Sequence, residues 1–425
     1  MTVLLIVVTL LILVLIGMPI ALALGGTGLI VILASGLPLQ AVPHLIYNSA
    51  NAYALTAIPL FMLMGAIVER AGMGKHLIDF ASALVGWMRG GLAHVNTLVS
   101  FLFAGMNGSA AADVASMGPI LIPEMKRKGY PLNFAAAITS STSDAAILIP
   151  PSIVLIVYGV LANVSITRMF LAGIIPGAIL MLSYMALTHF FAVRHKWPVH
   201  EQFDIKHIAP ATGRAGPALL IPFIIMGGIL GGIFTATEAA SIAVFAAIII
   251  VLVFYRNVSL RDAREILLVT AKRTGMVMMI IAASGILAWF LSNRQIPQQL
   301  ATALLQFTDN YYVITLIVCA FLIVLGTMIN GVPAMIILVP VLLPIMTAIE
   351  MDPIHFGIIF ALATTVGSQT PPVAATMLLT CAIAGISIAE MWRMNRWFIL
   401  LNVLVMLVVA TVPMFALWLP GKILD

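Results

Sequence analysis

The chain is a series of long apolar runs, and two polar interruptions fall inside such runs rather than between them. The first is a run of hydroxyl-bearing and acidic residues at 139–144, followed by a double proline at 150–151. The second covers 364–370 and precedes a double proline at 371–372. Because proline removes a hydrogen-bond donor and clashes with the preceding helical turn, each pattern predicts a broken helix.

A helix break at membrane depth needs partners for the backbone groups that it frees, since each unpaired group is costly in hydrocarbon. Breaks are tolerated where they are buried in protein or line a wet cavity, and there they hold ions or substrates. One break alone is explained equally well by a proline kink that neighbouring side chains satisfy. Two breaks of the same pattern favour a binding function.

The remaining pattern predicts a membrane scaffold around two sets of transport elements. Scaffold is expected at 1–91, 166–310 and 387–425, and transport elements at 92–165 and 311–386. In the first part we expect a helix over 3–34 bent near residue 17, a polar connection over 38–51, a span over 52–69, an interfacial amphipathic helix over 75–90, a hairpin over 92–128 and a broken helix over 131–162. The hairpin arms are short for full spans and meet at an Asn-Gly turn, which indicates a re-entrant hairpin.

The second part of the chain predicts the same order of elements. After a long helix over 169–193 and a cytoplasmic loop over 197–214, we expect spans over 216–233, 237–255 and 275–291, a charged connector over 256–273, an interfacial segment over 296–309, a hairpin over 311–349, a broken helix over 353–386 and a last helix over 397–419. Four proline pairs share one offset of 221 positions: Pro119 and Pro340, Pro123 and Pro344, Pro150 and Pro371, and Pro151 and Pro372. Four pairs on one offset indicate two structural repeats.

Composition agrees with this interpretation. The chain of 425 residues is 62% hydrophobic and only 8% charged, whereas an ordinary soluble domain is about 25% charged. This indicates an all-α polytopic membrane protein. The first residues carry no basic side chain, so we expect a retained helix rather than a cleaved signal peptide. Cys319 and Cys381 lie in apolar segments, where we expect neither a disulfide nor a metal site.

Basic residues predict the orientation of the chain in the membrane, because they gather on the cytoplasmic side. If the first helix runs outward from the cytoplasm, 17 of the 20 basic residues lie inside, and only Arg168, Arg294 and Lys422 lie outside. The basic residues therefore mark membrane edges and indicate no nucleic-acid partner. This assignment puts the N-terminus in the cytoplasm and the C-terminus in the periplasm. It also makes the repeats inverted, which is typical of secondary transporters with a site near the membrane midplane.

At each predicted site a hairpin tip faces a helix break, and the side chains there offer oxygen ligands without His or Cys. The first site combines Asn107, Gly108, Ser109 and Asp113 with Ser140, Ser141, Thr142, Ser143 and Asp144. The second combines Asn330, Gly331, Val332 and Pro333 with Thr364, Thr365, Gly367, Ser368, Gln369 and Thr370. Such oxygens suit Na⁺, and half-helix N-termini suit a carboxylate. Ser109 and Asp113 are alternatively explained as a helix cap and a charge that compensates the helix dipole.

Other function classes lack their motifs. The phosphate-binding loop of ATP-driven pumps, G-x-x-x-x-G-K-[ST], does not occur, and neither does the H-E-x-x-H of metalloproteases. We therefore expect no catalytic residue and no organic cofactor. A channel stays an alternative, because broken helices also line pores.

Four segments carry a family resemblance: GSAAADVASMGPILIP at 108–123, IPPS at 149–152, GGIFTATEAA at 231–240 and TPP at 370–372. With them the whole chain resembles the large membrane subunit, DctM type, of TRAP (tripartite ATP-independent periplasmic) transporters. The resemblance implies a Na⁺-coupled elevator-type importer in a bacterial inner membrane. It also implies two partners: a small DctQ-type membrane subunit, expected as a separate chain, and a periplasmic substrate-binding protein.

The resemblance further implies a small organic acid anion, such as a C4-dicarboxylate or sialic acid, as the substrate. One departure concerns Ser143 and Asp144, which stand where the family more often has small or uncharged residues. An acidic group there would strengthen a cation site or repel an anionic substrate, and both alternatives stay open.

Overall fold

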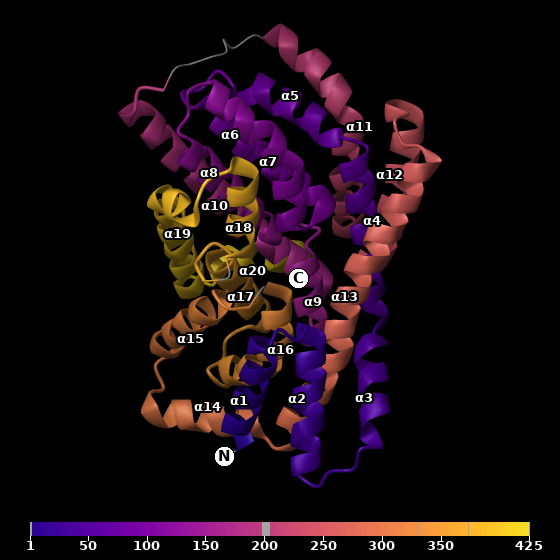
Figure 1. The fold of residues 1–425 in the computed structure, drawn as a ribbon, viewed down its shortest axis with the longest axis vertical. Coiled ribbons are helices and arrows are strands. Elements are labelled where there is room, and N and C mark those ends of the chain that lie inside the picture. The colour runs from indigo at the N-terminus through magenta and orange to yellow at the C-terminus, as the bar shows by residue number, and fades with distance from the viewer. Residues whose placement is uncertain (1, 198–204, 330, 373, 425) are drawn as a thin grey trace.

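The computed structural model describes residues 2–197, 205–329, 331–372 and 374–424 (Figure 1), and all regular elements in these ranges are helices. Eight of the described helical segments are long and apolar enough to cross a membrane. They are Tyr53–Arg70, Leu132–Leu161, Ile166–Arg194, Lys206–Leu230, Ala236–Tyr255, Leu260–Asn293, Gly331–Ala348 and Ile388–Thr411. The fold is therefore that of the all-α polytopic membrane protein expected from the sequence.

The N-terminal segment corrects the expected single bent helix over 3–34. Helix α1 covers Thr2–Leu15, and α2 covers Ile20–Ala34. Gly17 has a φ of +84°, which a glycine adopts without steric cost, and Pro19 then opens α2. A Cβ added at Gly26 of α2 would lie 3.5 Å from the Leu13 side chain of α1, so the two helices pack against each other.

The expected polar connection over 38–51 is also largely helical, because α3 covers Ala41–Ala50. A 3₁₀ turn at Tyr53–Thr56 leads into α4, Ala57–Arg70. Helix α5 covers Met73–Val85. It begins two residues before the interfacial segment expected over 75–90 and ends five residues before the end of that segment.

The first hairpin consists of α6, Gly91–Asn107, and α7, Ala110–Arg127. Its turn is formed by Gly108, which has a φ of +58°. The broken helix follows as α8, Leu132–Ala145, a 3₁₀ turn at Ala146–Leu148, and α9, Ile153–Leu161. The polar run at 139–144 is thus still helical, and the break itself covers only residues 149–152.

The broken helix lies in the centre of the molecule. In its most apolar window 89% of the residues are buried, whereas the other candidate spans have between 33% and 50% buried. Because a polar run in this position cannot reach lipid, its side chains must find partners within the protein.

Two expected connections are helical as well. The long helix α10 covers Ile166–Arg194, and α11 already begins at Ile205 and runs to Leu230, within the loop expected over 197–214. Residues 198–204 of that loop lie outside the described residues. Helix α12, Ala236–Ile250, continues as a π-helical turn at Val251–Tyr255.

The charged connector expected over 256–273 forms the first half of α13, a single helix over Leu260–Asn293. A capping box supports its start, since Ser259 and Asp262 each bond the backbone N–H of the other. The charged segment, which begins with this capping box, therefore extends the membrane helix α13 and does not form a separate connector between two spans.

The second half contains α14, Ile296–Phe307, a hairpin of α15, Tyr311–Gly326, and α16, Gly331–Ala348, and a second broken helix. The break separates α17, Pro353–Gly367, from α18, Ala375–Ala384. The chain ends with α19, Ile388–Thr411, and α20, Met414–Leu424, in place of one last helix over 397–419. Both double prolines contain a cis peptide bond.

The ends of the molecule differ in charge. Helix α5, the end of α10 and the start of α11 lie at one end, whereas α14 and the N-terminus lie at the opposite end (Figure 1). The first end carries most of the basic residues, including Arg70 and Arg194. Helix α1 therefore begins at the end opposite to α5 (Figure 1), and the orientation of the termini in the membrane stays a prediction.

Candidate functional site

The tip of the first hairpin touches the first helix break. A Cβ added at Gly108 would lie 2.6 Å from the carbonyl oxygen of Pro151 and 3.5 Å from the Cα of Ser152. Only a glycine allows this approach, because the residue has a positive φ and because there is no space for a side chain between it and the break. The sequence predicted this juxtaposition, and the break places backbone carbonyl groups beside the tip.

The second hairpin has the corresponding contact. A Cβ at Gly331, which opens α16, would lie 3.3 Å from the Cβ of Thr364 in α17. The preceding residue, Asn330, lies outside the described residues. At the other arm, Gly326 and Gly367 bring α15 and the end of α17 together, since a Cβ at Gly367 would lie 2.4 Å from the Gly326 carbonyl carbon.

The polar side chains at the first tip have different roles. The Asn107 side-chain oxygen accepts a hydrogen bond of 3.0 Å from the backbone N–H of Ser109. The hydroxyl of Ser109 makes no capping hydrogen bond, so the helix-cap alternative fails for this residue. Asp113 is fully buried, and neither of its carboxylate oxygens has a hydrogen-bond partner in the described part of the chain.

Four of the five candidates on α8 make identified hydrogen bonds, and α6 supplies some of the partners. Asn96 donates to Thr139 at 2.6 Å, and the hydroxyl of Thr142 lies 3.2 Å from that of Ser100. The hydroxyl of Ser143 donates to the backbone oxygen of Thr139 at 2.8 Å. Because hydroxyl groups can bond to a carbonyl one turn back, the polar run stays helical instead of breaking the helix.

The two predicted sites are joined into one network. Ser141 of α8 donates a hydrogen bond of 2.9 Å to the Gln369 side chain at the second break, and Asn395 of α19 donates to the backbone oxygen of Gln369 at 3.3 Å. Thr376 of α18 donates to a carboxylate oxygen of Asp144 at 2.8 Å. The sequence-based prediction, which assigned each break to its own hairpin, did not include this connection.

Several members of this network were absent from the predicted set, namely Asn96, Ser100, Thr376 and Asn395. A usable signal existed for one of them, because Thr376 is an isolated polar residue that follows the second double proline by four positions. Asn395 stands between Arg393 and Arg396 in the charged start of α19 and gives no such signal. An isolated polar residue in a membrane helix predicts a polar partner inside the bundle.

The hydroxyl groups of the second break mostly bond to their own helix. The four residues share a bond to a carbonyl three or four positions back: Thr364 to Ala361, Thr365 to Leu362, Ser368 to Thr365 and Thr370 to Val366. Their oxygens keep lone pairs that can accept a donor or ligate a cation. Of the predicted hairpin residues, Pro333 is buried within α16.

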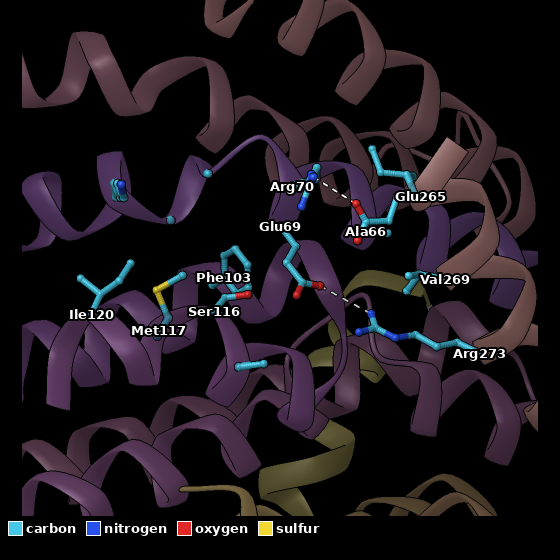
Figure 2. Close-up of a pocket in the computed structure, with 15 residues that line it drawn as sticks. Ala66, Glu69, Arg70, Phe103, Ser116, Met117, Ile120, Glu265, Val269 and Arg273 are labelled. Carbon is cyan, nitrogen blue, oxygen red and sulfur yellow. Dashed lines mark ion pairs between the residues drawn. The ribbon is translucent and has the colours of Figure 1, made fainter. Parts of the chain in front are cut away.

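A cavity of about 400 Å³ lies between the first hairpin and helices α4, α5 and α13 (Figure 2). Arg273 pairs with Glu69 at 3.5 Å, and Arg70 pairs with Glu265 at 3.0 Å and with Asp262. All of these ion pairs connect α4 with α13. The side of the cavity formed by α7 carries no charge and consists of Ala115, Ser116, Met117 and Ile120.

None of the predicted site residues lines this cavity, although Ala115 and Ser116 follow Asp113 by two and three positions. The sequence-based prediction missed it, because its lining residues come from four separately predicted segments, namely the span over 52–69, the interfacial helix over 75–90, the hairpin over 92–128 and the charged connector over 256–273. Ser116 is the one member of the α7 wall with a polar side chain, and its hydroxyl is buried without a partner in the described ranges.

The arrangement suits a hard monovalent cation. The buried network offers carboxylate, hydroxyl, amide and carbonyl oxygens, which are the ligands that such cations prefer. Within the described residues no cluster of three or more His, Cys, Asp or Glu side chains could hold a metal ion. Na⁺ therefore fits the donor set, with Asp113, Asp144 and the break carbonyls as its candidate ligands.

Fold and site together define a multi-pass helical membrane protein with the fold of a transporter. A solved structure, that of the YdaH transporter from Alcanivorax borkumensis, matches with a TM-score of 0.63 at 14% identity and covers 87% of this chain and 86% of that one. The family model described as "Tripartite ATP-independent periplasmic transporter, DctM component" matches residues 7–415. The chain belongs to this family and is the large permease component of a TRAP transporter.

Relatives with described roles are transporter permeases and not enzymes. The C4-dicarboxylate TRAP transporter large permease protein DctM of Pseudomonas aeruginosa is 35% identical over 376 residues, 88% of each chain. The sialic acid TRAP transporter large permease protein SiaM of Vibrio cholerae is 33% identical over 368 residues, which is 87% of this chain and 86% of SiaM.

Proposed function

We propose that this permease imports a small organic acid anion together with Na⁺ by an elevator movement of its hairpins and broken helices. The observation that carries the proposal is the contact of Gly108 with the Pro151 carbonyl at the first break, repeated at the second hairpin by Gly331 and Thr364. The first contact places a break carbonyl beside the hairpin tip, and the second places the side chain of Thr364, near the end of α17, beside the start of α16. Carbonyl and hydroxyl oxygens near helix ends in the buried centre can hold an ion and an anion together.

The coupling to Na⁺ is supported by the charge of the buried network. Asp113 and Asp144 are both fully buried, and neither forms an ion pair with a Lys or Arg side chain among the described residues. A buried carboxylate without a counter-charge is costly, so a cation that binds there gains much of its affinity from offsetting this cost.

An organic acid as the substrate is supported by two lines of evidence. Relatives that are named for a substrate are permeases for C4-dicarboxylates, sialic acid, isethionate and 2,3-diketo-L-gulonate. The cavity between α7 and the pair α4–α13 has a volume within the range of small-molecule sites and includes Arg70, Lys75 and Arg273 in its lining. Arg70 and Arg273 are paired with Glu265 and Glu69, which also line the cavity, so Lys75 gives the lining a net positive charge that suits an anion.

The family description names a tripartite system. We therefore propose two partners for the permease, a small membrane subunit and a periplasmic protein that delivers the acid. The basic end of the molecule, with Arg70 and Arg194, would face the cytoplasm of a bacterial inner membrane. The binding protein would then dock at the opposite end.

The elevator movement is supported by the position of the cavity. It separates α7, a predicted transport element, from α4 and α13, which belong to the predicted scaffold, and no ion pair among the described residues crosses it. A hairpin that moves along this wall would break no charged contact.

The test is uptake into proteoliposomes that contain the permease with its two partners. A Na⁺ gradient should drive accumulation of a labelled dicarboxylate or sialic acid, and unlabelled acid on the far side should accelerate exchange. Flux that does not saturate, needs no Na⁺ and shows no exchange would contradict a transporter and favour a channel.

A further inference from the structure

The cavity between α7 and the pair α4–α13 lies where a membrane span ends. Glu69 and Arg70 are the last two residues of the candidate span Tyr53–Arg70, and Lys75 belongs to the first turn of α5. Helix α5 itself lies at one end of the molecule (Figure 1). The headgroups of a bilayer lie just outside its hydrocarbon core, so the cavity is at the depth of phospholipid headgroups.

The charges of the lining leave one cation without a counter-charge. Glu69 pairs with Arg273 at 3.5 Å, and Glu265 pairs with Arg70 at 3.0 Å. Lys75 is exposed and forms no ion pair among the described residues. A phosphodiester group carries one negative charge, which would match this one cation.

The lining also offers uncharged and acidic hydrogen-bonding groups. The hydroxyl of Ser116 is buried without a partner in the described ranges, and Figure 2 shows this residue on the α7 wall, opposite Glu69 and Arg273. A hydroxyl group can donate a hydrogen bond to a phosphate oxygen, and a carboxylate can accept one from a hydroxyl group of a ligand. The donor set therefore suits a phosphate whose substituent carries hydroxyl groups.

Apolar surface belongs to the same cavity and continues beyond it. In the lining, Ala115 is exposed, and Ile120 and Val269 are partly exposed. Leu268 and Met276 of α13 are exposed, and each follows a charged lining residue by three positions, which puts it on the same side of the helix. A small organic acid has no apolar part that could cover this surface, whereas the acyl chains of a lipid can cover it.

We propose that the cavity binds the headgroup of an anionic phospholipid, with the phosphate at Lys75 and Ser116. The headgroup hydroxyl groups would donate to Glu69 and Glu265, and the acyl chains would lie along the exposed side of α13. Basic pockets between membrane helices near the cytoplasmic surface bind such headgroups. The inference goes beyond the proposed function and does not depend on Na⁺ coupling, although an acid that passes through the cavity would compete for Lys75.

The test records the melting temperature of the purified, delipidated permease in detergent while one lipid is added. A ligand that binds only the folded state raises the melting temperature with its concentration. Phosphatidylglycerol should do so at lower concentrations than phosphatidylcholine, whose headgroup has no net charge and no hydroxyl group. Glycerol phosphate, added at the same concentrations, should produce no comparable rise, because it lacks the acyl chains.

A charge variant tests the phosphate contact. Lys75→Gln changes an exposed side chain and should need roughly 5-fold more phosphatidylglycerol for the same rise, the effect of one basic residue beside an anionic headgroup. Lys196→Gln is the matched control, because Lys196 is exposed after the end of α10 and does not line the cavity. Its response to phosphatidylglycerol should equal that of the unchanged protein.

A second variant leaves the charges as they are. Ala115→Phe places a ring in the cavity from the exposed side of α7 and should also weaken the response to phosphatidylglycerol. Equal responses to the two lipids, or equal losses in Lys75→Gln and Lys196→Gln, would overturn the inference. A rise with glycerol phosphate as large as that with phosphatidylglycerol would overturn it as well and would assign the site to a soluble anion.

Discussion

The hydroxyl of Ser141 donates a hydrogen bond of 2.9 Å to the side-chain oxygen of Gln369, a residue 228 positions further along the chain. The bond connects the polar run of the first broken helix to the break of the second. Because both residues are fully buried, the polar centre of the molecule is shared by both halves, and a change in one half should be felt in the other.

Replacing Ser141 by Ala should therefore raise the Na⁺ concentration needed for half-maximal uptake. Loss of one neutral hydrogen-bonding group costs about 0.5–1.5 kcal/mol, which is roughly a 2- to 12-fold change in affinity. Thr365→Ala at the second break should act in the same direction. The measurement is uptake as a function of Na⁺ concentration. Thr411→Ala is the control, because Thr411 makes the same kind of bond to its own helix as Thr365 but lies at the end of α19, outside both breaks. Unchanged Na⁺ dependence in both variants would count against these ligand assignments.

A crosslink across the cavity should stop transport. Ala115 of α7 and Ala66 of α4 both line it, so cysteines at these positions joined by a short bifunctional reagent would tie the hairpin to the scaffold. The background should lack Cys319 and Cys381, the two free cysteines. The readout is uptake against the fraction of crosslinked protein.

The matched control joins two predicted transport elements. A Cβ at Gly118 of α7 would lie 3.2 Å from the Ile383 side chain of α18, so a Gly118→Cys and Ile383→Cys pair would connect parts that should move together. This crosslink should preserve more activity than the first. Full uptake after complete crosslinking of Ala115→Cys to Ala66→Cys would rule out the elevator movement.

The contact between α15 and α17 should tolerate no side chain. In Gly367→Ala the added methyl group would meet the Gly326 carbonyl carbon at 2.4 Å, and overpacking of this kind costs about 1–3 kcal/mol. We expect a lower melting temperature in detergent. Gly213→Ala in α11, where nothing lies within 4 Å, should leave the melting temperature unchanged or raise it slightly. Equal melting temperatures for the two variants would contradict the close contact.

Labelling of single cysteines tests the orientation. Arg214→Cys at the basic end should react with an impermeant reagent only from the cytoplasmic side, and Lys422→Cys near the C-terminus only from the periplasmic side. Both side chains are exposed. Reaction of both positions from the same side would refute the inverted arrangement of the two halves.

Local signals in the sequence predicted much of the fold. The first hairpin was expected over 92–128 and is found over 91–127, because a turn dipeptide at residue 107 and basic residues at 126–128 mark its limits. The double prolines predicted that both helices break, but the predicted breaks begin too early in the chain. The hydroxyl groups of the polar runs bond back to their own helices, so these runs are still largely helical. The extent of α13 was missed, because a charged first half was interpreted as a connector.

The sequence predicted many residues of the candidate site, but not which of them contact each other. Gly108 meets its own break, as the pattern predicts, whereas Asp144 contacts α18 of the other half. Such a contact depends on how distant helices pack, and no local periodicity encodes it. The same holds for the cavity beside α7, whose charged wall combines residues of α4 and α13 that lie about 200 positions apart.

That charged wall has a consequence for the ionic conditions under which the permease works. The pairs of Arg70 with Asp262 and Glu265, and of Arg273 with Glu69, are partly exposed and lie entirely between α4 and α13. Dissolved salt screens such pairs. A rising salt concentration should therefore weaken the link between α4 and α13, whereas the α7 side of the cavity, which carries no charge, should not respond to it.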